Sequence, residues 1–389
     1  MEIREIAIAR PKLGAEEEAA VTRVLRSGWL TQGPEVAAFE EEFAAYVGAK
    51  HACAVSSATT GLHLALLAAG VGAGDEVITV SHSFIATANA IRYCGATPVF
   101  VDIKPGTFNI DSKSVERAIS SKTKAIMTVH QIGVPCDLAA LTAIASHAGI
   151  PLIEDAACAI GSKYQGEIIG KPHGVSAVFS FHPRKVLTTG DGGMITTSDP
   201  AMNAFFRKAR QHGMSVNDLE RHRSKTIQFE NYEQPGFNYR MTDLQAAVGR
   251  IQLKRLPELL EDRNRIAARY QQAFAGLRGI EIPRIPEYAT PNWQSYGFRI
   301  TGESPMDRNA LMAALLEQKI STRRGVMCAH REPAYQGTPL KFPLPESEAM
   351  QDHSILLPIH SEMSAADVER VIQAISDIMQ AAPSKARTR

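Results

Sequence analysis

The sequence predicts an α/β protein with a large domain, built on a mostly parallel mixed sheet flanked by helices, and a smaller α+β C-terminal domain. Two observations support this prediction. Between about residues 50 and 200, β-rich apolar runs alternate with helical patterns, which is typical of βαβ units and of parallel sheets. Beyond residue 240 the alternation gives way to long helical stretches. We therefore expect the large domain to cover residues 1–250 and the smaller domain residues 251–389.

The large domain is expected to contain short strands with helices between them. The predicted strands are Glu76–Val80, Thr97–Asp102, Ala125–His130, Pro151–Asp155, Ser176–Phe181 and Gly192–Thr197. The predicted helices are Phe84–Tyr93, Ser114–Ser120 and Asp137–His147. A further helix should follow the last strand, because Asp199 can cap its start and Pro200 fits its first turn.

The C-terminal part is expected to be mainly helical. The stretch 242–274 is largely helical in pattern, and Pro257 should kink or divide it, because proline removes a helical hydrogen bond. The spacing of Ser364 and Asp367 predicts a capping box at the start of the last helix. The other predicted elements are a strand, Tyr296–Thr301, a helix, Asp307–Gln318, and a frayed tail, Ala381–Arg389.

Composition excludes several classes of protein. The 389 residues include Lys+Arg 42 and Asp+Glu 41, a net charge of +1 that gives no strong field for nucleic acid. No run of eighteen apolar residues is present, so a membrane span is not expected. The five cysteines are scattered without a CxxC pair, which indicates neither a disulfide framework nor a structural metal site. The N-terminus lacks the apolar core of a signal peptide, so we expect a cytoplasmic enzyme.

The segment Ser56–Gly61 (SSATTG) precedes the helical pattern LHLALLAAG. Backbone N–H groups at a helix start, together with the helix dipole, form a natural site for phosphate. An ordinary helix cap would leave the same pattern and, on this segment alone, is favoured about two to one. No GxxxxGK[ST] motif is present, so a nucleotide P-loop is not indicated.

Two further segments carry groups that could act on a ligand. Glu154 and Asp155 end a predicted parallel strand, where one acid should face the ligand crevice and the other should face away. A capping role for Asp155 is about equally compatible with this position. Lys185 follows another strand end and precedes a glycine-rich turn, and a partly desolvated lysine there could form a Schiff base. Pyridoxal 5′-phosphate would use all three segments together, because it needs a phosphate cup, a carboxylate and a lysine.

From about Pro11 to Ile378 the chain resembles the DegT/DnrJ/EryC1/StrS family, the sugar aminotransferases of the fold-type I pyridoxal 5′-phosphate enzymes. The motifs that carry this resemblance are SGWLTQGP (27–34), SSATTGLHLAL (56–66), SHSFIATANAI (81–91), VHQIGVPCD (129–137), IEDAACAIG (153–161), SFHPRKVLTTGDGGM (180–194) and GFNYRMTDLQAA (236–247).

The resemblance implies a role for individual residues. Lys185 matches the lysine that forms the Schiff base and moves the proton, and Asp155 matches the partner of the ring nitrogen. Phe84 matches the aromatic residue on the ring face. The phosphate cup is matched by Ala58, Thr59 and Ser180. Asn238 matches the residue that reaches the phosphate from the other subunit, which implies a homodimer with composite active sites.

At two positions, Cys158 and Arg184, the chain departs from the family pattern, and at a third, His330, it matches a family motif only loosely. Cys158 stands where the family usually has Gln or His against the ring hydroxyl oxygen, and thiols are much weaker donors. Arg184 replaces a small or hydroxyl residue beside the lysine and is a candidate contact for an anionic substrate group. A solvated arginine is an equally good interpretation. His330 lies in a loose match to a sugar-site motif and is a candidate substrate contact.

The resemblance implies a pyridoxal 5′-phosphate-dependent aminotransferase that takes an amino group from glutamate or glutamine. The acceptor would be a keto group on a sugar, nucleotide-linked by family analogy, or on a cyclitol. Two alternatives remain, a pyridoxal 5′-phosphate-dependent lyase or dehydratase and a regulatory homologue without turnover. In the family, sugar 3-dehydratases carry His in place of the lysine, so Lys185 argues against that activity.

Overall fold

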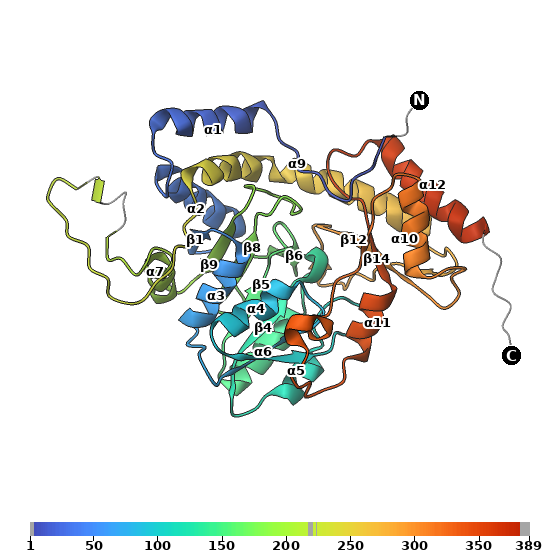
Figure 1. Cartoon of the computed structure of the whole chain (residues 1–389), viewed down its shortest axis with the longest axis horizontal. Helices are drawn as coiled ribbons and strands as arrows, with labels where there is room; N and C mark the ends of the chain where they lie inside the picture. The colour runs from blue at the N-terminus through green and yellow to red at the C-terminus, as the bar shows by residue number, and fades with distance from the viewer. Residues whose placement is uncertain (1–3, 217–220, 223, 382–389) are drawn as a thin grey trace.

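The computed structural model describes residues 4–216, 221–222 and 224–381. These residues form a large sheet flanked by helices, with a smaller antiparallel sheet beside it (Figure 1). Ala381 ends the last helix, and the rest of the tail predicted to fray lies outside the described residues. None of the helices within the described ranges combines the length and the apolar character needed to cross a membrane.

The large sheet is mixed but mostly parallel, which confirms the predicted fold class. Its strands, in order across the sheet, are β1 (His51–Val55), β9 (Gly193–Thr197), β8 (Ser176–Ser180), β5 (Leu152–Asp155), β4 (Thr123–Val129), β2 (Glu76–Val80) and β3 (Thr97–Val101). Every pair from β8 to β3 is parallel, and β9 runs against both of its neighbours. The carboxyl ends of β1, β2, β4, β5 and β8 therefore meet at one edge, where open α/β sheets bind ligands.

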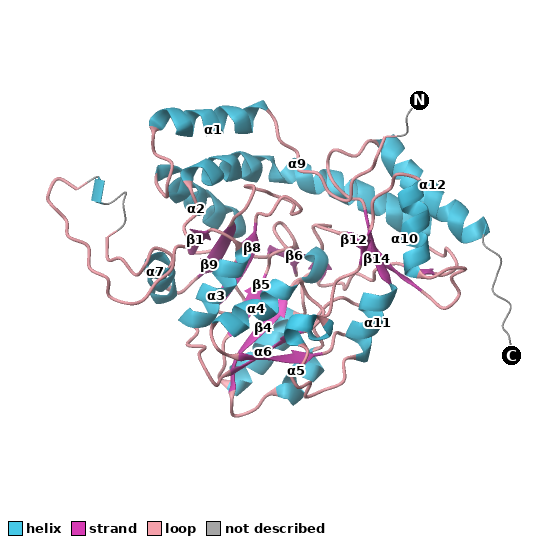
Figure 2. Cartoon of the chain, in the orientation of Figure 1, coloured by secondary structure: helices cyan, strands magenta, loops and turns pink. Residues whose placement is uncertain are grey.

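Helices cover both faces of this sheet, as Figure 2 shows. The helices of this region are α2 (Pro34–Val47), α3 (Ala58–Ala68), α4 (Ile85–Tyr93), α5 (Ser112–Ala118), α6 (Leu138–Ala148) and α7 (Pro200–Ala209). Side chains alternate along β8, so that Val178 packs in the core beneath α3 while Phe179 packs against Phe43 of α2 on the other face. Burial on both faces explains why these strands are nearly continuous apolar runs.

The longest helix, α9 (Asp243–Phe274), crosses from the large sheet to the smaller one (Figure 1). It begins at a capping box in which Thr242 and Gln245 bond each other's backbone, and α1 (Ala15–Ser27) lies along it. Its first half packs in the core of the large sheet through Leu253, Leu256 and Leu259, and its second half packs in another core through Ile266, Tyr270 and Phe274.

The prediction that Pro257 divides this stretch is wrong, because the proline lies inside one continuous helix. A proline removes one backbone hydrogen bond, whereas apolar burial on both sides of it keeps both halves helical. Tertiary packing here outweighs the local preference.

The smaller sheet is antiparallel throughout. Its strands, in order, are β10 (Ile280–Glu281), β12 (Tyr296–Ile300), β14 (Ser354–Leu357) and β13 (Arg323–Arg324). The end of α9, α10 (Arg308–Glu317) and α12 (Ala365–Ala381) cover it around an aromatic core. Ser364 and Asp367 form the predicted capping box at the start of α12.

The remaining elements lie in the connections. They are the three-stranded sheet of β11 (Ala289–Thr290), β6 (Lys163–Tyr164) and β7 (Glu167–Ile168), the helix α11 (Pro345–His353), and the 3-10 turns η1 (Gln131–Gly133), η2 (Ala329–Arg331) and η3 (Pro333–Tyr335).

Candidate active site

The two acids that end β5 point to opposite faces of the sheet, as their alternation predicts. Asp155 accepts hydrogen bonds from Thr87 Oγ1 (2.8 Å) and from the backbone N–H of Ala157 (3.1 Å). Burial raises the pKa of the Asp155 carboxyl, although these donors and the charge of Lys185 oppose the rise. Asp155 is thus a buried carboxylate with no cation in direct contact among the described residues. It would be stabilised by a positively charged or proton-donating group.

Glu154 has a complete set of partners on the other face. Its carboxylate contacts His130 Nε2 (3.1 Å) and accepts the backbone N–H groups of His173 (2.7 Å) and Gly174 (3.3 Å). Burial alone would raise the pKa of Glu154, but the hydrogen bond and charge of His130, with the backbone donor of His173, outweigh burial and lower it. These contacts indicate a structural role for Glu154.

Lys185 lies in the turn after β8 and contacts Cys158. The Lys185 backbone N–H donates to His182 O (2.8 Å), and Nζ donates to Cys158 Sγ (2.9 Å). The loop then folds back onto the strand, because Thr188 Oγ1 donates to the backbone oxygen of Phe181 (2.8 Å). Lys185 also lies within electrostatic range of Asp155, so the structure brings these two predicted residues together.

The start of α3 forms a tight, cap-bound turn. Ser57 Oγ accepts the N–H of Thr60 (3.2 Å), which leaves the N–H groups of Ala58 and Thr59 without an acceptor among the described residues. A Cβ added at Gly193, the first residue of β9, would lie 2.7 Å from the nitrogen of Ala58. Only glycine permits this close approach. Ser180 ends β8 opposite Gly193, which places the last predicted member of the phosphate cup near the helix start.

Phe84 and Asn238 lie near the same edge. Phe84 is the N-cap residue of α4, and its side chain is 62% exposed, an unusual position for a large apolar ring. Asn238 pairs with Gln211 in an isolated bridge. Its neighbour Tyr239 accepts the N–H of Ser56 (2.8 Å), so the segment that carries Asn238 runs beside the start of α3 in the same chain.

Arg184 is exposed beside Lys185 and lies within electrostatic range of another arginine, Arg323. Burial lowers the pKa of the Arg184 guanidinium, and the charge of Arg323 on β13 lowers it further. No carboxylate forms an ion pair with Arg184 or Arg323 within the described ranges. This pair of cations indicates an anion-binding capacity at the mouth of the site.

His330 belongs to a network at the end of β2. Its Nδ1 contacts Ser81 Oγ (2.7 Å) and its Nε2 contacts Glu348 Oε1 (3.0 Å). Both ring nitrogens are thus engaged by the protein. The network joins the η2 turn to the large sheet, and the proposed sugar contact of His330 stays a prediction.

Several residues that hold the site in place were not predicted from the sequence. Thr87 lies three positions after Phe84, one turn along α4, and this spacing could have placed both beside the same ligand. Asn292 donates to the backbone oxygens of Cys158 and Ile160 (2.8 Å each), and Gln294 donates to that of Arg184 (3.2 Å). No local signal in the sequence indicates these long-range contacts.

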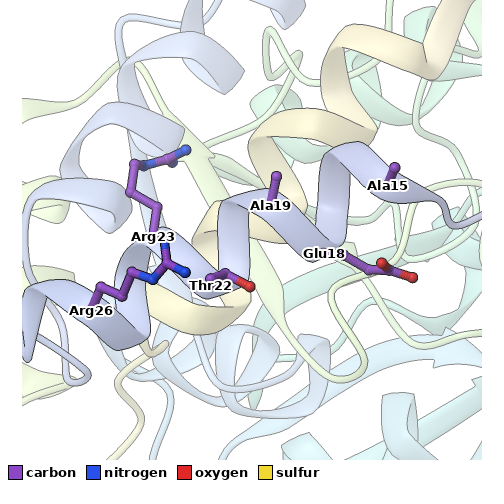
Figure 3. A pocket seen from close by; sticks show the side chains of 6 residues that line it. All are labelled: Ala15, Glu18, Ala19, Thr22, Arg23 and Arg26. Carbon is purple, nitrogen blue, oxygen red and sulfur yellow. The ribbon is translucent and has the colours of Figure 1, made fainter.

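A shallow hollow lies elsewhere, on the outer surface of α1 (Figure 3). Its lining residues, all from this helix, are Ala15, Glu18, Ala19, Thr22, Arg23 and Arg26. None of these lining residues belongs to the strand-end cluster described above. One of them, Arg23, already forms an ion pair with Glu35 (2.9 Å). A surface formed by a single helix does not enclose a ligand, so the strand-end cluster remains the candidate site.

Known proteins resemble this chain over nearly its whole length. The model of the DegT/DnrJ/EryC1/StrS aminotransferase family matches residues 11–376. The spore coat polysaccharide biosynthesis protein SpsC of Bacillus subtilis (strain 168) is 40% identical over 376 residues, which cover 96% of each chain. The aminotransferase TlmJ from Streptoalloteichus hindustanus is 34% identical, with a TM-score of 0.90 over 98% of this chain and 100% of TlmJ. Spr1654 from Streptococcus pneumoniae, solved in its PLP form, is 28% identical, with a TM-score of 0.89 over 98% of this chain and 100% of that one.

Proposed function

The chain belongs to the DegT/DnrJ/EryC1/StrS aminotransferase family of pyridoxal 5′-phosphate enzymes, and we propose that it aminates a keto group of a nucleotide-linked sugar or a cyclitol, with glutamate or glutamine as donor. One observation carries the assignment of the site. Asp155 is buried without a cationic contact from the residues that the structure describes, while the amine of Lys185 lies within its electrostatic range. This pairing matches what the cofactor requires at its ring nitrogen and its aldehyde.

The residues present fit pyridoxal 5′-phosphate. A protonated pyridine nitrogen would offset the burial that raises the pKa of Asp155. The N–H groups of Ala58 and Thr59 lack acceptors among the described residues, and three phosphate oxygens could supply them. The exposed ring of Phe84 supports a role as the aromatic contact of the ring face.

When bound, the cofactor supplies an aldehyde that combines with amines and a ring that accepts electron density when a carbon-bound proton leaves. Asp155 would hold a proton on the ring nitrogen, which would make the ring a better electron acceptor. Thr87 and the N–H of Ala157 hold the carboxylate in place for this task. The phosphate end would be held by Ala58, Thr59 and Ser180, and the close approach of Gly193 to the start of α3 would leave room for this turn.

Lys185 has two tasks in this proposal. Its amine would hold the aldehyde carbon of the bound cofactor, and as a free amine it would carry a proton to and from the substrate carbon. General acid–base catalysis of this kind contributes roughly 10²–10⁴-fold to a rate. Cys158, in contact with Nζ, occupies the position expected to face the ring hydroxyl oxygen.

At the mouth of the site, we assign Arg184 to an anionic group of the substrate, such as a diphosphate or the donor carboxylate. The second cation, Arg323, supports this assignment, because two like charges that form no ion pair with a described carboxylate favour an anion nearby. His330 would contact the sugar only if its bond to Ser81 or Glu348 were exchanged.

A homodimer with composite sites is part of the proposal. Exposed apolar side chains support it, since Ile227 and Phe229, in the segment between α7 and α9 that reaches away from the sheet (Figure 1), are 85% and 83% exposed. Mixing Lys185→Ala protein with Asn238→Ala protein should restore activity, because hybrid dimers then contain one intact site. Activity that stays at the sum of the two variants would contradict a shared site.

The function is tested by following the visible absorbance of the cofactor. Borohydride treatment of the loaded enzyme, followed by peptide mapping, should place the cofactor label on Lys185. Glutamate or glutamine should convert the visible spectrum to that of the amine form, and keto sugars linked to UDP, dTDP or GDP, or a keto inositol, should reverse it. Product formed without consumption of a donor would instead support a lyase or dehydratase. Binding without any spectral conversion would support a regulatory homologue.

A further inference from the structure

We propose that Cys158 and Lys185 form a site of oxidative modification, at which a peroxide causes the thiol sulfur and the amine nitrogen to join in a covalent S–N bond. The two side chains come from the turns after β5 and β8 and meet at 2.9 Å between Sγ and Nζ. Neither side chain is fully buried, so a small oxidant can reach the pair. Asn292 fixes the backbone of Cys158, which holds the thiol beside the amine.

Cys158 differs from the other four cysteines of the chain. Cys53, Cys136 and Cys328 have no exposed surface, so oxidants cannot approach them directly. Cys94 is half-buried like Cys158, but burial raises the pKa of its thiol to about 12, its sulfur donates to a backbone oxygen, and the residue packs against a hydrophobic core. Cys158 contacts the amine of Lys185 and lies within electrostatic range of Arg184. Cationic surroundings of this kind are where cysteines react with oxidants.

The chemistry balances with hydrogen peroxide as the oxidant. In the first step sulfur attacks the peroxide, an S–O bond forms, the O–O bond breaks, and the second oxygen leaves as water. Sulfur loses two electrons, and the peroxide gains them. In the second step the Nζ lone pair attacks sulfur, an S–N bond forms, the S–O bond breaks, and the hydroxyl leaves as water with a proton from the amine. The linked pair has lost two hydrogen atoms relative to the thiol and amine.

This modification depends on whether the amine of Lys185 is free. In the proposed function, the amine is engaged while the cofactor carries its aldehyde, and it is free when the cofactor is in its amine form. The aldehyde form should therefore protect the pair. Only this protection rests on the proposed function, because the cross-link itself requires just the 2.9 Å contact.

The test compares two loaded forms of the full-length protein. Protein loaded with pyridoxamine 5′-phosphate and protein loaded with pyridoxal 5′-phosphate are treated with hydrogen peroxide, digested and analysed by mass spectrometry. We expect the pyridoxamine form to yield a linked pair of peptides containing residues 158 and 185, about 2 Da lighter than their sum. Dithiothreitol should separate the pair. The pyridoxal form should yield at least tenfold less.

Matched variants identify the atoms. Cys158→Ser should abolish the link, and Cys94→Ser should leave it unchanged, because among the described residues the Cys94 thiol is hydrogen-bonded to a backbone oxygen and not to an amine. Lys185→Arg should stop the reaction at the sulfenic acid of Cys158, which dimedone traps. Oxidation of Cys158 to the sulfinic acid in the pyridoxamine form without any linked peptide would overturn the inference. A link that forms equally in both loaded forms would support the modification site and contradict the assignment of Lys185 to the cofactor.

Discussion

Glu154 and Asp155 are adjacent, both buried, and belong to one strand, yet the two faces of β5 treat their carboxylates in opposite ways. On one face, His130 and two backbone N–H groups surround Glu154, and together they lower its pKa against the effect of burial. On the other face, burial raises the pKa of Asp155 despite two hydrogen bonds.

The difference separates a structural carboxylate from one prepared for a ligand. A buried charge with a full set of donors stabilises the fold around it, whereas a buried charge that lacks a cationic contact lowers stability until a ligand supplies one. The protein can keep Asp155 in this state because the surrounding sheet is well packed. Substitution of Asp155 should therefore change mainly the reaction rate. Substitution of Glu154, on the opposite face of β5, should change mainly the free energy of unfolding.

The largest effect is expected on the ligand face from Lys185→Ala. Removal of the amine eliminates both the cofactor attachment and the proton carrier, so turnover should be lost and the visible absorbance of the attached cofactor should disappear. The loss of the acid–base function alone corresponds to roughly 10²–10⁴-fold. Absorbance spectra and a coupled amination assay measure the two effects. Thermal unfolding should change little, because Lys185 is partly exposed. Retained turnover would remove the assignment.

The next effect is expected from Asp155→Asn. The amide preserves the shape and the contact with Thr87 but cannot hold a proton on the ring nitrogen, so the rate should fall by roughly 10²–10³-fold. Apo-protein stability at neutral pH should rise slightly, because a raised folded pKa means that the ionised carboxylate opposes folding above its ordinary value of 3.8. This gain should shrink as the pH falls toward that value. An unchanged rate would show that Asp155 has no role in the reaction.

Glu154→Gln should have the converse effect. The substitution leaves His130 without its carboxylate, and the loss of one partner from a buried pair costs about 3–5 kcal/mol of unfolding free energy. Since the folded pKa of Glu154 lies below its ordinary 4.5, the stability difference from wild type should be complete at neutral pH and should diminish below pH 4.5. Urea unfolding at several pH values measures it. A rate loss as large as that of Asp155→Asn would contradict a purely structural role for Glu154.

The opposite orientation of these acids could be predicted from the sequence, because side chains alternate in any strand. Six of the seven strands of the large sheet could also be predicted, since each is a short and largely apolar run, whereas β1 was not predicted. The Cys158–Lys185 contact could not, because it depends on how two turns close over the sheet edge. Strand β13, which carries Arg323, has only two residues and shows no periodicity. The local rule that proline ends a helix failed at Pro257, because packing against two cores keeps α9 helical on both sides of it.

The smallest effect, and the sharpest test of the ligand face, is expected from Thr87→Val. This change keeps the shape but removes the 2.8 Å hydrogen bond to Asp155 Oδ2, so the ionised carboxylate that pairs with the cofactor ring becomes less stable. The Kd for pyridoxal 5′-phosphate, measured by absorbance titration, should rise about tenfold, which corresponds to about 1.4 kcal/mol.

Two controls separate this hydrogen bond from its neighbours. Thr87 Oγ1 also contacts Ser83 Oγ (2.8 Å), so Ser83→Ala removes that contact while leaving the bond to Asp155 in place. Thr87→Ser retains a hydroxyl. Both controls should bind the cofactor nearly as wild type does, because each preserves a donor to Asp155. If Ser83→Ala weakened binding as much as Thr87→Val, the Ser83–Thr87 contact rather than the bond to Asp155 would account for the effect. The contrast between the two faces of β5 would then rest on burial alone.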